Sequence, residues 1–108
     1  MQQSGINRHP RLCTQAAAYQ NGMWVVGAAK AGKEDGHGLY GGSCIVAPTG
    51  EIVAQSMTED DEVIVYDCDL DLGEYIKKTI FNFEKHRRIE HYKLITEQTG
   101  VVVPEDLR

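Results

Sequence analysis

The hydrophobic pattern is clearest over residues 41–55, where two short apolar runs flank a turn. The runs lie at residues 44–47 and 52–54, and the sequence Pro-Thr-Gly at 48–50 separates them. Proline presets a turn-compatible φ, and glycine tolerates the positive φ that tight turns need. The pattern therefore predicts a β-hairpin. Because helical patterns lie on either side of it in the sequence, we expect this hairpin at the centre of a sheet.

A helix is predicted before the hairpin. Pro10 suits the first turn of a helix, where its missing N–H is not needed. Apolar residues then recur at helical spacing from Leu12 to Tyr19, and Gly22 follows as a stop signal. The residues before this pattern are polar and lack periodicity. We therefore expect residues 1–11 to form a frayed or disordered N-terminal segment.

Three further segments complete the expected sheet region. Residues 23–29, MWVVGAA, form a continuous apolar run, which is typical of a strand buried on both faces. Residues 30–38 are rich in glycine and charge, which predicts a loop. Residues 62–70 alternate loosely between apolar and polar side chains and predict a third sheet strand. The outer strands of such a sheet would have open edges that another segment must cover.

The C-terminal part is predicted to be helical and then extended. Residues 71–74 have the form of a capping box, with Ile76, Ile80 and Phe83 on the buried side of the helix that follows. Residues 101–108 form a short apolar tail, which we expect to lie on a neighbouring subunit. The resulting order of helix, strand, hairpin, strand, helix and tail is half of a layered α/β architecture. We interpret the chain as a piece of something larger.

Composition and charge narrow the class of protein. A chain of 108 residues forms at most one domain, and its 42% apolar and 25% charged residues are typical of soluble globular proteins. A net charge of −5 gives no argument for nucleic acid or an anionic membrane as partner. No apolar run approaches the roughly 20 residues that span a bilayer. The three irregularly spaced cysteines indicate reduced thiols, so we expect a cytoplasmic protein.

Ser43 and Cys44 are the first candidates for chemistry. A cysteine nucleophile needs a base or a positive local field, and Cys44 is followed by Ile45 and Val46 in a predicted strand. We therefore expect it to be a buried structural residue. Ser43 lies in GGSCI and not in the G-x-S-x-G elbow that exposes a serine nucleophile.

The two C-terminal histidines are a candidate metal cluster with Glu84 and Glu90. His86 and His91 are five positions apart, which rotates them by about 140° on a helix, so they do not share a face as a zinc pair would. A solvated helix face is the favoured interpretation.

The loop at residues 33–38 offers Glu34, Asp35 and His37 as metal ligands. It lacks the alternating carboxylates of a calcium loop, which favours a mobile surface loop. No pattern of residue types in the chain predicts an active site with confidence from chemistry alone.

Arg87, Arg88 and Tyr92 allow two interpretations. They could bind an anion, or the arginines could hold a C-terminal segment by ion pairs. The second interpretation is favoured.

Four stretches together resemble the C-terminal part of the carbon–nitrogen hydrolase (nitrilase) superfamily. They are QAAAYQNGMWVVGAAK at 15–30, GSCIVAPTGEIVA at 42–54, DEVIVYDCDLD at 61–71 and FNFEKHRRIEHYKLI at 81–95. The resemblance covers residues 12–100, and its nearest branch is N-carbamoyl-D-amino-acid amidohydrolase. The hairpin and the last stretch are specific when they occur in this order.

This resemblance implies a fold and an activity. The fold is α/β, the C-terminal part of an α-β-β-α sandwich that dimerises, often with C-terminal segments crossing between subunits. Members hydrolyse non-peptide C–N bonds with a glutamate, a lysine and a cysteine, without a metal or organic cofactor. The carbamoylase branch converts an N-carbamoyl-D-amino acid to the D-amino acid, CO2 and ammonia.

The resemblance also implies which residues this chain lacks. The family's catalytic residues lie upstream of the matched part, Cys44 does not match the nucleophile motif, and no lysine has the context of the catalytic lysine. Ile89 stands where many members have proline. Lys30 lies at the end of the apolar strand, where relatives often have asparagine near the pocket rim, and is the one substrate-proximal candidate.

We therefore expect the C-terminal portion of an amidohydrolase, inactive alone, whether a truncated product, a split-enzyme subunit or a fragment. Its expected partners are an N-carbamoyl amino acid substrate and either further copies of itself or a missing N-terminal half. The alternatives are a fragment of a β-ureidopropionase-like amidohydrolase and a non-catalytic module that completes a nitrilase-type sandwich.

Overall fold

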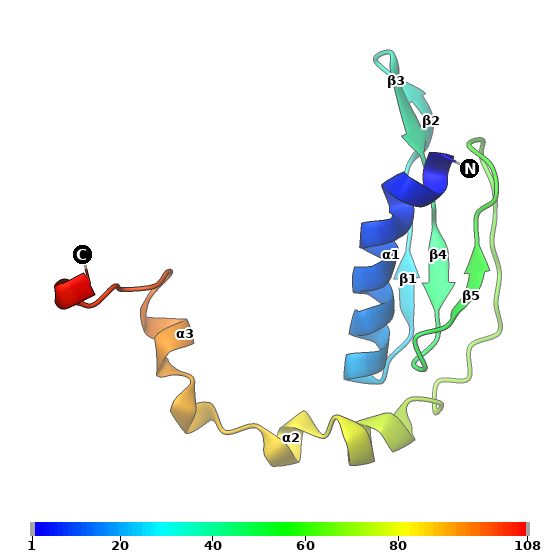
Figure 1. Ribbon diagram of the computed structural model, residues 1–108. Coiled ribbons are helices and arrows are strands. Elements are labelled where there is room, and N and C mark those ends of the chain that lie inside the picture. Colours follow the sequence, from blue (N-terminus) through cyan, green and yellow to red (C-terminus); the bar gives the residue numbers. More distant parts are fainter. Residues whose placement is uncertain (1, 108) are drawn as a thin grey trace.

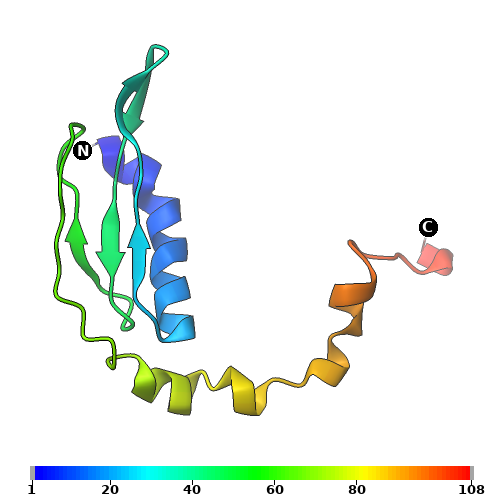
Figure 2. The ribbon, with the colours of Figure 1, turned by 180° about the vertical axis from the view of Figure 1, so that it is seen from behind.

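The computed structural model describes residues 2–107, with side chains at 10–33, 35–36 and 41–107. A long helix and a small sheet lie together, and the rest of the chain leads away from them (Figures 1 and 2). The radius of gyration is 19.1 Å, against about 13 Å for a compact domain of 100 residues. We call residues 61–107 the arm. The helix–sheet unit consists of α1 (Gln2–Asn21), β1 (Val25–Gly27), β4 (Cys44–Val46) and β5 (Ile52–Gln55).

Helix α1 (Gln2–Asn21) begins earlier than the pattern predicted and contains Pro10 in its interior. Residues 2–11, which we expected to be frayed, therefore have helical backbone; Met1 lies outside the described residues. No second proline interrupts this segment, so local chemistry does not force a later start. The predicted end is confirmed: the Gly22 N–H donates to the Tyr19 carbonyl at 3.2 Å, directly after Asn21.

The predicted hairpin is confirmed as β4 (Cys44–Val46) and β5 (Ile52–Gln55), which pair antiparallel. Within the turn the Gly50 N–H donates to the Ala47 carbonyl at 2.8 Å. Strand β1 (Val25–Gly27) pairs with the other edge of β4, so the order is β1-β4-β5. The hairpin supplies the central strand, as expected.

The core lies between α1 and the sheet. Ala18 of α1, Cys44 and Val46 are almost completely buried, and Val25 and Ile52 pack against them. Cys44 and Val46 share one face of β4 because side chains alternate along a strand. The small Ala18 side chain permits close approach of the helix to this face.

Strand β1 differs from its prediction. It is an edge strand, and Val26 at its centre is 68% exposed. The run was expected to be buried on both faces. A continuous apolar run shows only that both faces tolerate burial; within residues 2–107 only α1 covers this sheet, on one face.

The predicted loop at 30–38 is instead a second hairpin, β2 (Ala31–Glu34) with β3 (His37–Tyr40). The connection consists of Asp35 (φ 52°) and Gly36 (φ 81°). Two positive φ values form the hairpin turn that matches strand twist, and Asp-Gly is a preferred sequence for it. The dipeptide was the signal that the loop prediction missed.

The strand predicted at 62–70 is not formed: residues 61–69 make no strand ladder. The segment is anchored by the Trp24 Nε1–H, which donates to the Asp69 carbonyl at 2.8 Å, and by the Trp24 and Tyr66 rings, 5.8 Å apart. An alternating pattern permits pairing, but a ladder also needs a partner edge in register. Val63 is 86% exposed as a result.

The arm continues through short helical turns (Figure 1). They are a π-helical turn η1 (Ile76–Ile80), α2 (Phe83–His86), η2 (Ile89–His91), α3 (Lys93–Glu97) and η3 (Glu105–Leu107). Of the three residues predicted to form a buried side, only Ile76 is buried; Ile80 and Phe83 are about half exposed. The prediction failed there because η1 reaches α1 over one turn only.

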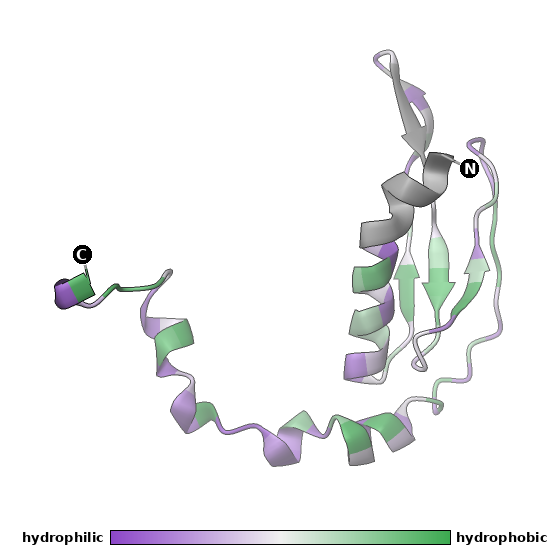
Figure 3. Ribbon diagram, viewed as in Figure 1, coloured by the Kyte–Doolittle hydropathy of each residue, from purple (hydrophilic) through white to green (hydrophobic). Residues whose placement is uncertain are grey.

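Apolar side chains are spread along the arm without cover. Figure 3 shows apolar segments far from the sheet. The most exposed of these side chains are Val63, Val65, Leu70, Leu94, Ile95, Val101 and Leu107. Over residues 2–107, no helix has both the length and the apolar character needed to cross a bilayer.

Candidate functional site

A cavity of about 460 Å³ lies where the sheet meets the start of the arm. Three segments line it: the residues after β1, those before β4, and those after β5. Lys30, which the resemblance marked as substrate-proximal, is part of the first segment. The structure brings Lys30 to a cavity of this size; its role stays a prediction.

The backbone around Lys30 is held by hydrogen bonds to the segment before β4. The Ser43 hydroxyl accepts from the Ala29 N–H at 2.8 Å and lies 3.3 Å from the Ala29 carbonyl as a donor. The Gly41 N–H donates to the Lys30 carbonyl at 3.1 Å. Ser43 is therefore engaged with backbone groups of the cavity wall, a role that its sequence context did not indicate.

The segment after β5 adds to the cavity lining a carboxylate that is held by a turn. Glu62 accepts from the Met57 N–H at 2.9 Å and from the Thr58 N–H and hydroxyl, each at 3.0 Å. These bonds, led by the one from Met57, lower the pKa of the Glu62 carboxyl. Asp60 and Asp61 also line the cavity. The lining therefore combines one lysine with three acidic residues.

Ser56 adds an unusual polar group to this cavity. Its Oγ is buried and has no hydrogen-bond partner among the described residues, while its N–H donates to the Ser43 carbonyl at 2.8 Å. Buried hydroxyls are nearly always paired. The sequence analysis missed Ser56 and Glu62 because neither belongs to a recognisable motif.

Cys44 is confirmed as a buried residue of the core, only 4% exposed. The thiol packs with the apolar side chains of Ala18, Val25, Val46 and Ile52 in the core. These are the surroundings of a structural cysteine.

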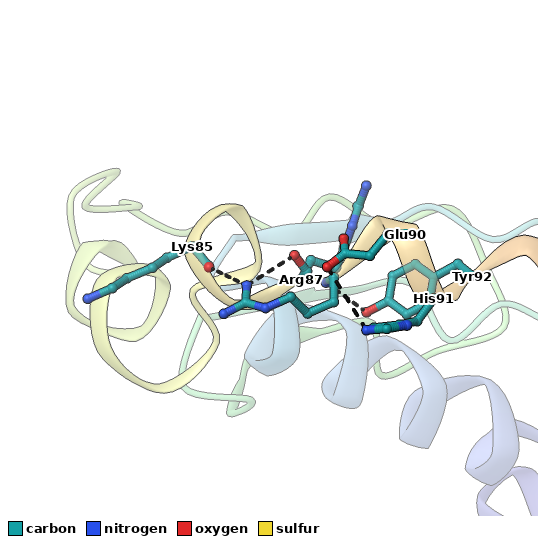
Figure 4. Close-up of polar contacts among 6 residues, drawn as sticks. Lys85, Arg87, Glu90, His91 and Tyr92 are labelled. Carbon is teal, nitrogen blue, oxygen red and sulfur yellow. Dashed lines mark hydrogen bonds and ion pairs between the residues drawn. The ribbon is translucent and has the colours of Figure 1, made fainter.

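The C-terminal histidines lie on the arm, His86 at the end of α2 and His91 in η2; Figure 4 shows His91. His91 Nε2 is 4.0 Å from a Glu90 oxygen, and both side chains are mostly exposed. Among the described residues, no three His, Cys, Asp or Glu side chains are grouped to hold a metal ion. Of the predicted loop ligands, the Glu34 and His37 side chains lie outside the described part, and Asp35 forms the β2–β3 turn.

The ion pairs expected between the arginines and a C-terminal segment are not formed within the described residues. The Arg88 guanidinium donates instead to the Lys85 carbonyl at 3.1 Å and lies 3.5 Å from the Arg87 carbonyl. Figure 4 shows these contacts within a single stretch of the arm. The contacts of the arginines stay local because the structure does not bring an acidic group of the tail, residues 101–107, close to them.

A carbon–nitrogen hydrolase crystal structure from Helicobacter pylori G27 superposes with a TM-score of 0.76 at 20% identity, over 90% of this chain and 35% of that chain. This likeness confirms the predicted fold class, a partial nitrilase-like α/β fold. It says nothing finer about activity, because the identity is low.

Sequence similarity agrees with the fold. A Schizosaccharomyces pombe protein named as a probable nitrilase is 32% identical over 82 residues, which is 76% of this chain and 30% of that protein. The chain thus spans about a third of the length of both relatives. The sequence profile of the carbon–nitrogen hydrolase family matches residues 2–78. Because this match covers most of the sequence, the chain belongs to the carbon–nitrogen hydrolase family.

Proposed function

We propose that this chain is the C-terminal portion of an amidohydrolase that cleaves the carbamoyl C–N bond of N-carbamoyl-D-amino acids. The products would be the D-amino acid, CO2 and ammonia. The family match over residues 2–78 carries the hydrolase part of this proposal. The resemblance of residues 42–54 and 81–95 to the carbamoylase branch supports the choice of substrate.

The chain contributes a wall of the substrate pocket in this proposal. Lys30 lines the cavity at the end of the sheet, and its ammonium is suited to the carboxylate that every N-carbamoyl amino acid carries. The nucleophilic cysteine, the glutamate base and the catalytic lysine come from the part of the family's fold that precedes these residues. The chain alone is therefore inactive, and the reaction needs no metal or organic cofactor.

The exposed apolar arm supports the proposed partners. Side chains such as Leu94, Ile95 and Val101 are more than two-thirds exposed, and an apolar surface of this kind marks an interaction site. We infer that the arm is covered by a second subunit or by the N-terminal part of the same fold. We further propose a cytoplasmic location, since the three cysteines are free thiols.

The test is ammonia release by the complete reading frame that contains this sequence. It is measured with N-carbamoyl-D-amino acids, their L enantiomers and N-carbamoyl-β-alanine, with the 108-residue chain alone as control. Preference for the D enantiomer supports the proposal. Preference for N-carbamoyl-β-alanine favours the β-ureidopropionase-like alternative, and no hydrolysis of any substrate favours the non-catalytic assembly module.

A second arm tests the inactivity of the isolated chain. Turnover by the 108-residue chain that is lost in Cys44→Ser would overturn the assignment of Cys44 as structural.

A further inference from the structure

Ser43 stands at the point where the sheet ladder ends and the cavity begins. The paired residues of β1 and β4 end at Gly27 and Cys44. Two residues beyond Gly27, the Ser43 hydroxyl bonds to both the N–H and the carbonyl of Ala29. The side chain thus continues the connection between the two segments after backbone pairing has stopped.

These bonds fix the residue that follows Ala29. The Lys30 carbonyl accepts from the Gly41 N–H at 3.1 Å, so the backbone is held immediately before and immediately after the Lys30 Cα. Ser43 is itself held, because its carbonyl accepts from the Ser56 N–H at 2.8 Å. Fixing both neighbouring peptide groups sets the direction in which the Lys30 side chain leaves the backbone.

We propose that Ser43 is a positioning residue that holds Lys30 at the cavity wall for contact with the substrate carboxylate. This inference rests on the proposed function. Holding a charged group in place before binding raises affinity, because less freedom is lost when the ligand arrives. Ser43 therefore acts through Lys30 and takes no part in bond breaking.

Because its partner Ala29 is exposed, a positioning role of Ser43 can be distinguished from a purely structural role. Ala29 is exposed, so water can replace the hydroxyl if Ser43 is shortened, and the fold loses little. Water bound in place of the hydroxyl cannot, however, fix the direction in which the Lys30 side chain leaves the backbone. Ser43→Ala should therefore change substrate recognition more than stability.

The experiment uses the complete enzyme with Ser43→Ala, Ser43→Thr and Lys30→Met. Each variant is assayed with an N-carbamoyl amino acid and with its carboxamide, which lacks the carboxylate. We expect Ser43→Ala to raise KM for the carboxylate substrate about fivefold, with kcat and the carboxamide KM within about twofold of wild type. Ser43→Thr, which keeps the hydroxyl, should restore most of the affinity, and Ser43→Ala should add nothing in the Lys30→Met background.

Equal losses on both substrates, or additive losses in the double variant, would overturn the proposal. A readout without turnover separates its failure from that of the proposed function. The rate of reductive methylation of Lys30 relative to Lys33, measured by peptide mass spectrometry, should change about twofold or more in Ser43→Ala and stay unchanged in Ser43→Thr. An unchanged ratio in Ser43→Ala refutes the positioning role; a changed ratio in a protein that hydrolyses nothing refutes the proposed function alone.

Discussion

The helix–sheet unit and the arm are both rich in apolar residues, yet they use them in opposite ways. In the helix–sheet unit, Ala18 and Val46 are fully buried, whereas Val101 in the arm is 90% exposed. The helix–sheet unit is joined by strand pairing between segments distant in sequence. Backbone bonds in the arm run mostly between residues three to five apart, such as His86 N–H to Asn82.

This difference shows that apolar content alone does not produce a core. A short helical turn buries its apolar side only against a partner, since isolated helices of this length are marginal in water. The arm touches the helix–sheet unit near η1 and then continues without a second contact layer (Figure 2). Beyond that contact, the apolar side chains of the arm are mostly exposed within residues 2–107.

Gly73 lies at the joint between the arm and the helix–sheet unit, where its backbone approaches that of Gly22. A Cβ at Gly73 would overlap the carbonyl oxygen of Gly22, so Gly73→Ala should separate the backbones. We expect a loss of about 3 kcal/mol in the free energy of unfolding, as for other severe steric changes. Urea unfolding measures it, and Gly100→Ala, with no atom within 4 Å of the new Cβ, is the matched control. Equal effects of the two changes would contradict the joint.

Replacing one valine by alanine in each region compares how much a buried and an exposed valine contribute to stability. Val46→Ala removes buried methyl groups and should lower the free energy of unfolding by about 2 kcal/mol. Val101→Ala removes exposed ones and should change the stability of the isolated chain by less than about 0.5 kcal/mol. Thermal unfolding of both variants measures these losses of stability. A large effect of Val101→Ala would show that the tail is packed.

A charge in the arm tests whether a partner covers it. Ile95 is 76% exposed, so Ile95→Asp should leave the secondary structure of the chain unchanged by circular dichroism. In the complete protein, the same change should weaken assembly about tenfold or more, because a charge would be buried in an apolar interface. Sedimentation velocity measures the change, with Glu97→Gln as control. Unaltered assembly would place the partner surface elsewhere.

The smallest expected effect concerns the turn that leads into the arm. Glu62 has a pKa below its ordinary value of 4.5 in the folded chain. A lowered folded pKa means that its stabilising contribution is present above pH 4.5 and is lost as the pH falls through the lower folded pKa. Amide exchange at Met57 and Thr58, followed by NMR, should accelerate in that acidic range. Glu62→Gln should remove this pH dependence; if acceleration persists, another group is responsible.

Turn chemistry and local periodicity made the central hairpin, the end of α1 and the burial of Cys44 predictable. The family resemblance came from the identity of the residues in specific stretches, above all 42–54 and 81–95. The β2–β3 hairpin was predictable in principle from Asp35-Gly36, but the charged residues around it suggested a loop. The early start of α1 left no signal, because residues 2–9 contain neither a stop nor an apolar stripe.

Less of the candidate site than of the fold could be predicted from the sequence. Lys30 was singled out by resemblance, but its neighbours in the cavity come from three separate segments. The Ser43 and Glu62 hydrogen bonds join groups whose spacing follows no motif, so their geometry depends on where β1, β4 and β5 end. Ser56 illustrates the same limit, because an unpaired hydroxyl is a property of its surroundings.

The sequence by itself determined the central hairpin and the end of α1, because turn residues and periodicity act over a few residues. Its specific stretches at 42–54 and 81–95 carried the family resemblance. Only the tertiary structure decided that β1 is an edge strand, that residues 62–70 form no ladder, and that the arm stays uncovered. The physical reason is that burial and strand pairing require a partner surface. An apolar pattern states that a residue can be buried, and only the packed chain shows what buries it.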